Sequence, residues 1–143
     1  MWMMRALLAA LTALLLLAGP AAAHSYRAGG IMIGHVWVKP TATGNTEVFV
    51  SLLNKADAAD QLTAVFAPSA QAVGIFDAAS RRIGAVELLP NRPVSLKPGG
   101  TRIVLAGVDR PLRVGDKLKL TLVFARAGTV AVEAMVEAGP SHG

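Results

Sequence analysis

Histidine and methionine are the side chains of this sequence that point most directly to a chemistry. The 143 residues contain three histidines, and only two of the five methionines lie beyond residue 23. The candidates are His24, His35, His142, Met32 and Met135. Imidazole nitrogen suits copper in either oxidation state, whereas thioether sulfur favours Cu(I). The residue types therefore suggest a copper ligand set, provided that the fold brings some of these side chains together.

His24 directly follows a segment that is typical of a secretory signal. Arg5 precedes the apolar run "ALLAALTALLLLAG", and the segment ends in the three alanines 21–23. A charged start, a short apolar middle and an A-x-A end predict cleavage after the last alanine. The run is also short for a bilayer core of about 30 Å. We therefore expect a signal peptide over residues 1–23 and a mature domain over 24–143, in a periplasmic protein with no membrane span after cleavage.

Cleavage at this position would give His24 a free amino group. The amine and the ring Nδ1 would then form one chelate, which suits Cu(II) because this ion prefers nitrogen ligands in a square plane. The alternative is that a histidine follows the cleavage site by chance.

The second candidate, His35, lies three residues after Met32 in an expected strand. A regular strand sends two such side chains to opposite faces, unless Gly34 permits a bulge. Met32 and Met135 are also common types of core residue, and we expect them to pack in the core. The corresponding alternative for His35 is a half-buried, hydrogen-bonded position beside Trp37.

Most of the chain alternates short runs of Val, Ile, Leu and Thr with Gly, Pro, Asn and Asp. The expected strands are 31–38, 46–53, 61–67, 70–76, 83–89, 93–96, 101–108, 117–125 and 129–137. In "KLKLTL" the leucines alternate with polar residues, as in a strand with one buried face. This pattern predicts an all-β fold, a single antiparallel β-sandwich of seven to nine strands.

Composition argues against several classes of function. The sequence has no cysteine, and therefore no thiolate nucleophile or thiolate metal site. It has no G-x-S-x-G motif and no paired carboxylates, so we do not expect an enzyme. The 14 Lys and Arg against 9 Asp and Glu give only a mild positive balance, and aromatic residues make up 5%. A nucleic-acid partner is not expected, because such proteins carry a basic stripe interleaved with aromatic residues.

Several segments resemble the PCu(A)C-type periplasmic copper chaperones. They are "YRAGGIMIGHVWVKP", "NKADAADQL" and, most specifically, "SLKPGGTRIVLAGVDRPLRVGDKLKLTLVFARAG". The resemblance covers nearly the whole chain after residue 23. It implies a cupredoxin-like β-sandwich that hands Cu(I) to the copper centres of cytochrome oxidase.

The resemblance also implies a Cu(I) cage of two His and two Met, from which this sequence departs. Phe76 stands at the first His position, Glu87 or a neighbour at the first Met position, and Arg102 and Val104 at the closing His-x-Met pair. A permanent cation at Arg102 would repel Cu(I). We therefore expect Phe76 and Val104 to be packing residues near each other on one rim. Arg102 should face solvent or pair with an acid such as Glu87.

Two hypotheses follow. The first is a divergent copper chaperone-like protein that binds copper, as Cu(II) rather than Cu(I), through His24 and His35 and assists delivery to respiratory copper centres. The second is a metal-free interaction module of the same fold. In that module the surface around Arg81, Arg82 and Arg102 would contact an acidic partner protein in copper or cytochrome oxidase assembly.

Overall fold

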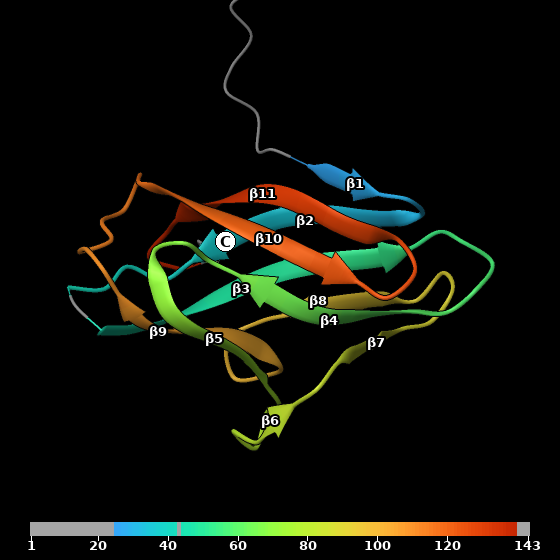
Figure 1. Ribbon diagram of the computed structural model, residues 1–143, viewed down its shortest axis with the longest axis horizontal. Helices are drawn as coiled ribbons and strands as arrows, with labels where there is room; N and C mark the ends of the chain where they lie inside the picture. The colour runs from blue at the N-terminus through green and yellow to red at the C-terminus, as the bar shows by residue number, and fades with distance from the viewer. Residues whose placement is uncertain (1–24, 43, 140–143) are drawn as a thin grey trace, which may run out of the picture.

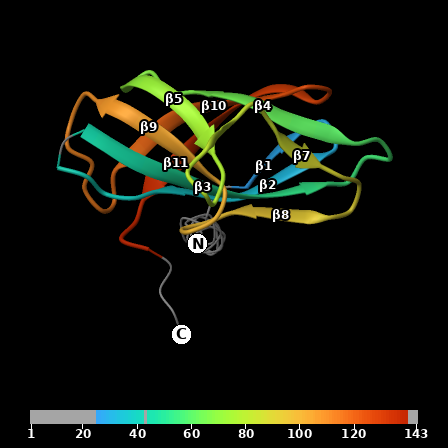
Figure 2. The same cartoon turned by 90° about the horizontal axis from the view of Figure 1, so that it is seen from below.

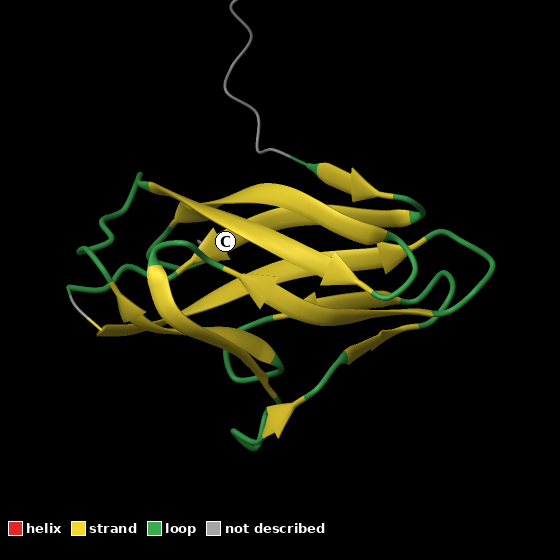
Figure 3. Ribbon diagram, viewed as in Figure 1, coloured by secondary structure: helices red, strands yellow, loops and turns green. Residues whose placement is uncertain are grey.

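The computed structural model describes residues 25–42 and 44–139. The expected signal segment, His24 and His142 lie outside these described residues. Strands and loops account for all of the described chain, in which no helix occurs (Figure 3). The described residues therefore hold no helix with the length and hydrophobicity needed to cross a membrane. The predicted all-β class is confirmed.

The described residues form eleven strands. They are β1 (Tyr26–Ala28), β2 (Ile31–Val38), β3 (Gly44–Asn54), β4 (Asp60–Phe66), β5 (Ala70–Phe76), β6 (Arg82–Ile83), β7 (Val86–Leu88), β8 (Pro93–Leu96), β9 (Arg102–Val108), β10 (Lys117–Phe124) and β11 (Gly128–Val136). The predicted number of seven to nine is too low for two reasons. β1 is too short to show a periodic pattern, and the expected strand 83–89 is divided into β6 and β7.

The strands form one continuous sheet that folds over into two packed layers (Figures 1 and 2). Their order is β6-β5-β9-β3-β2-β11-β10-β4-β7, with β1 added beside β2 and β8 beside β3. All strand pairs are antiparallel except β2 and β11, which run parallel, with Met135 opposite Trp37. β2, β3 and β8 lie in one layer and β4 and β10 in the other (Figure 2). The architecture is a cupredoxin-like β-sandwich, as the resemblance implied.

Strand β10 shows how the sequence pattern builds the core. Leu118, Leu120 and Leu122 are fully buried between the layers, whereas Lys117 and Lys119 are exposed. Burial of one such leucine contributes about 1.5–3 kcal/mol relative to leaving it in water. The predicted alternation of this strand is confirmed.

Strand β2 carries a bulge that the alternation did not require. His35 and Val36 together oppose the single residue Val50 of β3. His35 has a φ of 37°, in the left-handed region that the first residue of some bulges adopts. The extra residue reverses the phase of the strand, so Ile33 before it and Val36 and Val38 after it all face the core. The bulge therefore turns His35 outward.

Candidate functional site

His35 lies at the bulge with its side chain 51% exposed. Its Nε2 is 3.2 Å from Oε2 of Glu137, the residue that follows β11. The backbone N–H of Glu137 donates to the carbonyl of Val38 at 3.0 Å, which extends the parallel pairing of β11 with β2. An imidazole and a carboxylate from opposite ends of the chain thus meet on the outer face of the sandwich. His35 is exposed, so the alternative of a half-buried position is wrong.

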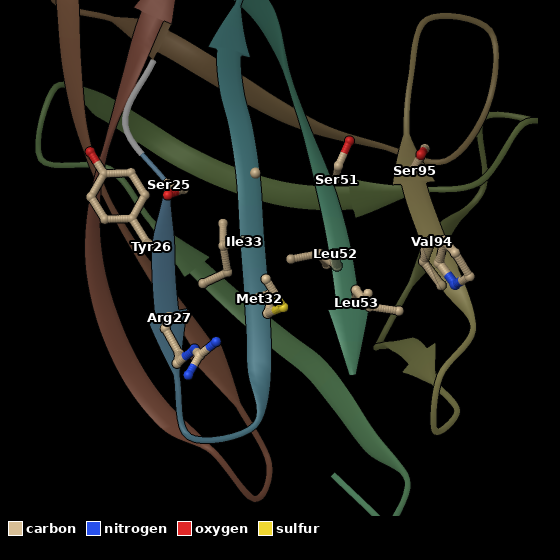
Figure 4. Close-up of a pocket in the computed structure, with 12 residues that line it drawn as sticks. Ser25, Tyr26, Arg27, Met32, Ile33, Ser51, Leu52, Leu53, Val94 and Ser95 are labelled. Atoms are coloured by element: carbon tan, nitrogen blue, oxygen red, sulfur yellow. The ribbon is translucent and has the colours of Figure 1, made fainter. Parts of the chain in front are cut away.

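Met32 lies on the same outer face as His35, because the bulge cancels the alternation between them. It is 40% exposed, so the expectation that it packs in the core is wrong. Its side chain lies in a mostly apolar groove of about 400 Å³ over β1, β2, β3 and β8, close to Leu53 (Figure 4). Among the described residues, no other sulfur and no imidazole lines this groove. Met32 therefore has no second soft donor beside it with which to hold Cu(I).

The family positions on β5 and β9 do come together. Phe76 lies directly opposite Arg102, and Val104 lies opposite Gly74. Phe76 and Val104 are thus diagonal neighbours on one face, a relationship with a Cα separation of about 7–8 Å. Both side chains are half-buried. The prediction that these two residues share one rim is confirmed, and we call Phe76, Arg102 and Val104 the rim site.

Arg102 makes four polar contacts from the centre of the rim site. Its Nε donates to Oε2 of Glu47, and its Nη1 to the carbonyls of Asp77 at 2.8 Å and Gly100 at 3.3 Å. Its Nη2 donates to Oγ of Ser80 at 2.9 Å. The Arg102 side chain is only 15% exposed. It therefore cross-links β9, β3 and the two loops that hold Asp77 and Gly100.

The acid that pairs with Arg102 is Glu47, so the suggestion of Glu87 is wrong. Glu87 lies on β7 opposite Gln61 of β4, at the other end of the strand order. Glu47 is brought to Arg102 by the pairing of β3 with β9, in which it lies opposite Val104. The alternation of β3 in the sequence indicates that Glu47 points outward, but it does not indicate that β9 is the neighbouring strand.

Glu47 also forms an ion pair with a second cation, Lys39. Nζ of Lys39 is 3.0 Å from its Oε1 and also lies 5.5 Å from the ring centroid of Phe49. Burial by itself would raise the pKa of Glu47. The hydrogen bonds from Lys39 and Arg102, with the charges of both residues, outweigh burial and hold the pKa below its ordinary value. The carboxylate is therefore ionised between two cations at neutral pH.

The rim site does not fit a Cu(I) cage. A phenyl ring, a guanidinium and an isopropyl group offer no lone pair for a soft metal, and the guanidinium carries a fixed positive charge. Among residues 25–42 and 44–139, no group of three or more His, Cys, Asp or Glu side chains could hold a metal ion. Among the described residues, His35 and Glu137 are thus a pair with no third His, Cys, Asp or Glu side chain to complete a metal site. His24, the other predicted ligand, lies outside it.

The fold and the rim site define a cupredoxin-like β-sandwich in which an arginine–glutamate ion pair holds the rim. The family model described as "Putative lipoprotein LpqE-like" matches residues 31–136. The chain therefore belongs to the LpqE-like family, and its structure is of the PCuAC type.

Three relatives illustrate this relationship. The chain is 32% identical to the copper-bound PCuAC domain from PmoF2, with a TM-score of 0.74. The match covers 82% of this chain and 99% of that domain. The chain is 30% identical to the apo PCuAC domain from PmoF1, with a TM-score of 0.76, covering 82% and 100%. "Putative lipoprotein Lxx21020" from Leifsonia xyli subsp. xyli (strain CTCB07) is 25% identical over 120 residues, 78% of this chain and 72% of that protein.

Proposed function

We propose that this chain is an exported, copper chaperone-like protein whose mature domain begins at His24 and binds Cu(II) through His24 and His35. The domain type supports copper, because a PCuAC domain of 32% identity is copper-bound. The rim site argues against the family's Cu(I) cage as the place of binding. Delivery of the ion to respiratory copper centres is the role that follows from a chaperone-like domain with an exposed site.

The path of β1 is the observation that carries the proposal. β1 runs antiparallel to β2, with Tyr26 opposite Ile33. Tyr26 is therefore at the end of β1 that lies nearest the bulge at His35. Ser25 is the first described residue, and each residue adds at most about 3.6 Å of reach. His24 is two residues from Tyr26 in the chain, and we expect it to reach His35 without closing a long loop.

The turn between β1 and β2 supports this arrangement. Gly29 has a φ of 52°, and Gly29 and Gly30 form the turn that joins the two strands. A Cβ on Gly30 would lie 2.8 Å from the Cβ of Ala56, so this position accepts no larger residue without a shift. The two glycines therefore suit the tight turn that places β1 beside β2.

Signal cleavage would create the metal site chemically. Before cleavage the nitrogen of residue 24 is an amide, which is a poor ligand, and afterwards it is an amine that closes a chelate with Nδ1. Cu(II) prefers such nitrogen donors in a square plane. Protons compete with the metal for the amine and the imidazoles, so affinity falls as the pH falls.

The alternative is a metal-free interaction module that contacts an acidic partner in copper or oxidase assembly. Arg81 and Arg82 are both exposed and could contact such a partner. Arg102 contributes little to that surface, because its side chain is largely buried and its guanidinium is hydrogen-bonded within the domain. This reading therefore depends on Arg81 and Arg82.

Copper titration of tag-free protein that begins at His24 tests the proposal. We expect Cu(II) binding to weaken more than about tenfold in His24→Ala and with one extra residue ahead of His24, because even outer-shell losses cost roughly 10–100-fold. His35→Ala should weaken it less, and Met32→Leu hardly at all. His142→Ala is the matched control for removal of one imidazole. Equal affinity in the wild type and His24→Ala would favour the metal-free module.

A further inference from the structure

We infer that the groove over β1, β2, β3 and β8 is the docking site for an extended, acidic segment of a partner protein. The groove of about 400 Å³ lies on the outer face of the sandwich (Figure 4). The inference rests on the proposed function for the identity of the partner, an exported protein that takes up the copper ion. Binding in the groove needs no metal, so it can be tested separately.

The first row of side chains in the groove is apolar and ends in a cation. Met32 of β2 lies opposite Leu53 of β3, which lies opposite Pro93 of β8. Arg27 of β1 lies opposite Met32 at the other end of the row. Methionine is common on surfaces that bind varied apolar groups, because its unbranched thioether chain adapts to their shape. The row therefore offers apolar contact beside a positive charge.

The charge of Arg27 is not compensated within the described chain. Arg27 is exposed, and none of the ion pairs among residues 25–42 and 44–139 includes it. It is also the one charged residue of these ranges that lines the groove. A carboxylate complements this end of the groove, so the site favours partners with an acidic residue at the matching position.

The second row of the groove is small and polar. Gly34 of β2 lies opposite Ser51 of β3, which lies opposite Ser95 of β8. Ser51 and Ser95 are exposed, and their hydroxyls bond to no other residue of the described chain. A hydroxyl both donates and accepts hydrogen bonds. This row therefore suits the N–H and C=O groups of a polypeptide backbone, and suits an acyl chain less well because that chain has no polar group along its length.

The width of the groove fits a short extended segment that crosses the strands. β1, β2, β3 and β8 are neighbours in this order. Four strands about 4.8 Å apart span roughly 14 Å, the length of about four extended residues at roughly 3.3 Å each. Such a segment passes beside His35, which follows Gly34 in β2. A docked copper acceptor is thus placed next to a proposed ligand of the ion.

Peptide titration of the metal-free protein, followed by nuclear magnetic resonance, tests the inference. The probes are the blocked tetrapeptide Glu-Leu-Ser-Leu and its counterparts with Gln or Lys in first place. We expect the amide signals of Met32, Ser51 and Ser95 to shift, and the Glu peptide to bind about threefold more tightly than the Gln peptide, as befits an exposed ion pair. The Lys peptide should bind most weakly. Arg27→Gln should abolish the preference for Glu, whereas Arg113→Gln, at an exposed position outside the groove, should keep it.

Gly34→Val separates loss of binding from loss of stability. A Cβ at Gly34 would lie 4.0 Å from the Cβ of Ser51, its nearest neighbour, so a side chain fits there and fills the groove. We expect this variant to match the wild type in thermal unfolding and to lose binding of all three peptides. Gly84→Val is the matched control, because Gly84 is exposed outside the groove and a Cβ there would also meet nothing within 4 Å.

The outcomes separate this inference from the proposed function. Absence of shifts with every peptide, or equal binding of the Glu and Lys peptides, overturns the docking site whether or not copper binds. Wild-type protein that binds Cu(II) no better than His24→Ala overturns the proposed function and not the docking site. Decanoate that displaces the Glu peptide would identify an acyl ligand. Shifts of the same amides with protein concentration alone would identify a second copy of the chain, and either result overturns the inference.

Discussion

Arg102 of β9 and Glu47 of β3 form an ion pair at the rim of the sandwich, beside Phe76. The family resemblance places a histidine ligand at the position of Arg102. A guanidinium that bonds to Glu47, to Ser80 and to two backbone carbonyls joins segments that are distant in the chain. The guanidinium of Arg102 therefore holds together the rim of this protein.

Removal of this guanidinium should destabilise the domain. We expect Arg102→Ala to lower the free energy of unfolding by ~2 kcal/mol, because hydrogen bonds to charged groups contribute roughly 1.5–3 kcal/mol. Urea unfolding at pH 7 measures the change. Arg92→Ala, at an exposed position, is the matched control and should change stability little. Equal effects of the two substitutions would contradict the cross-linking role of Arg102.

The ion pair also predicts how stability depends on pH. The pKa of Glu47 is lowered in the folded protein by Lys39 and Arg102, which outweigh the opposing effect of burial. The unfolded chain therefore binds the proton more readily, with an ordinary carboxyl pKa of about 4.3. The stabilisation is fully present above that pH and is lost as the pH falls through the folded pKa.

Glu47→Gln tests this dependence. The variant should be less stable than the wild type at pH 7, and the difference should shrink as the pH falls below about 4.3. Urea unfolding from pH 7 to pH 3 measures both proteins, with Glu87→Gln as a carboxylate control on β7. A difference that stays constant through this range would show that the charge of Glu47 does not act in this way.

The bulge predicts a conflict between stability and metal binding at His35. Left-handed backbone costs most residues roughly 1–2 kcal/mol, whereas glycine adopts it freely. We expect His35→Gly to be as stable as the wild type or more stable by up to ~1 kcal/mol, since glycine's larger entropy in the unfolded chain offsets part of the gain. His35→Val should be destabilised.

Thermal unfolding and Cu(II) titration of the same two variants make the comparison. Both should lose copper affinity, although only His35→Val should lose stability. If His35→Gly is clearly less stable than the wild type, the φ of 37° does not strain the chain, and the argument from strain fails.

The local sequence pattern was sufficient to predict where most of the strands lie in the chain. β2, β5 and β8 have the bounds that the sequence predicted, because each is a run of β-favouring residues that ends at a turn signal. β1 could not be predicted in this way, since three residues are too few to show a period. Its position depends on pairing with β2 and on the turn at Gly29 and Gly30.

The faces and neighbours of the candidate ligands depended more strongly on tertiary structure. A period-two pattern places Met32 and His35 on opposite faces, yet the bulge puts both on the outer face. Whether a strand bulges depends on how it matches its neighbours, here β3 and the parallel strand β11. The same parallel pairing brings Glu137 to His35, and nothing near either residue in the sequence indicates it.

The sequence by itself determined the all-β class, the buried faces of the strands and the loss of soft ligands from the rim, because residue type and alternation are local properties. The tertiary structure decided that Arg102 pairs with Glu47 and not Glu87, and that His35 meets Glu137. These contacts join strands far apart in the chain. Their register is set by the burial of whole faces in the shared core, which no short stretch of sequence contains.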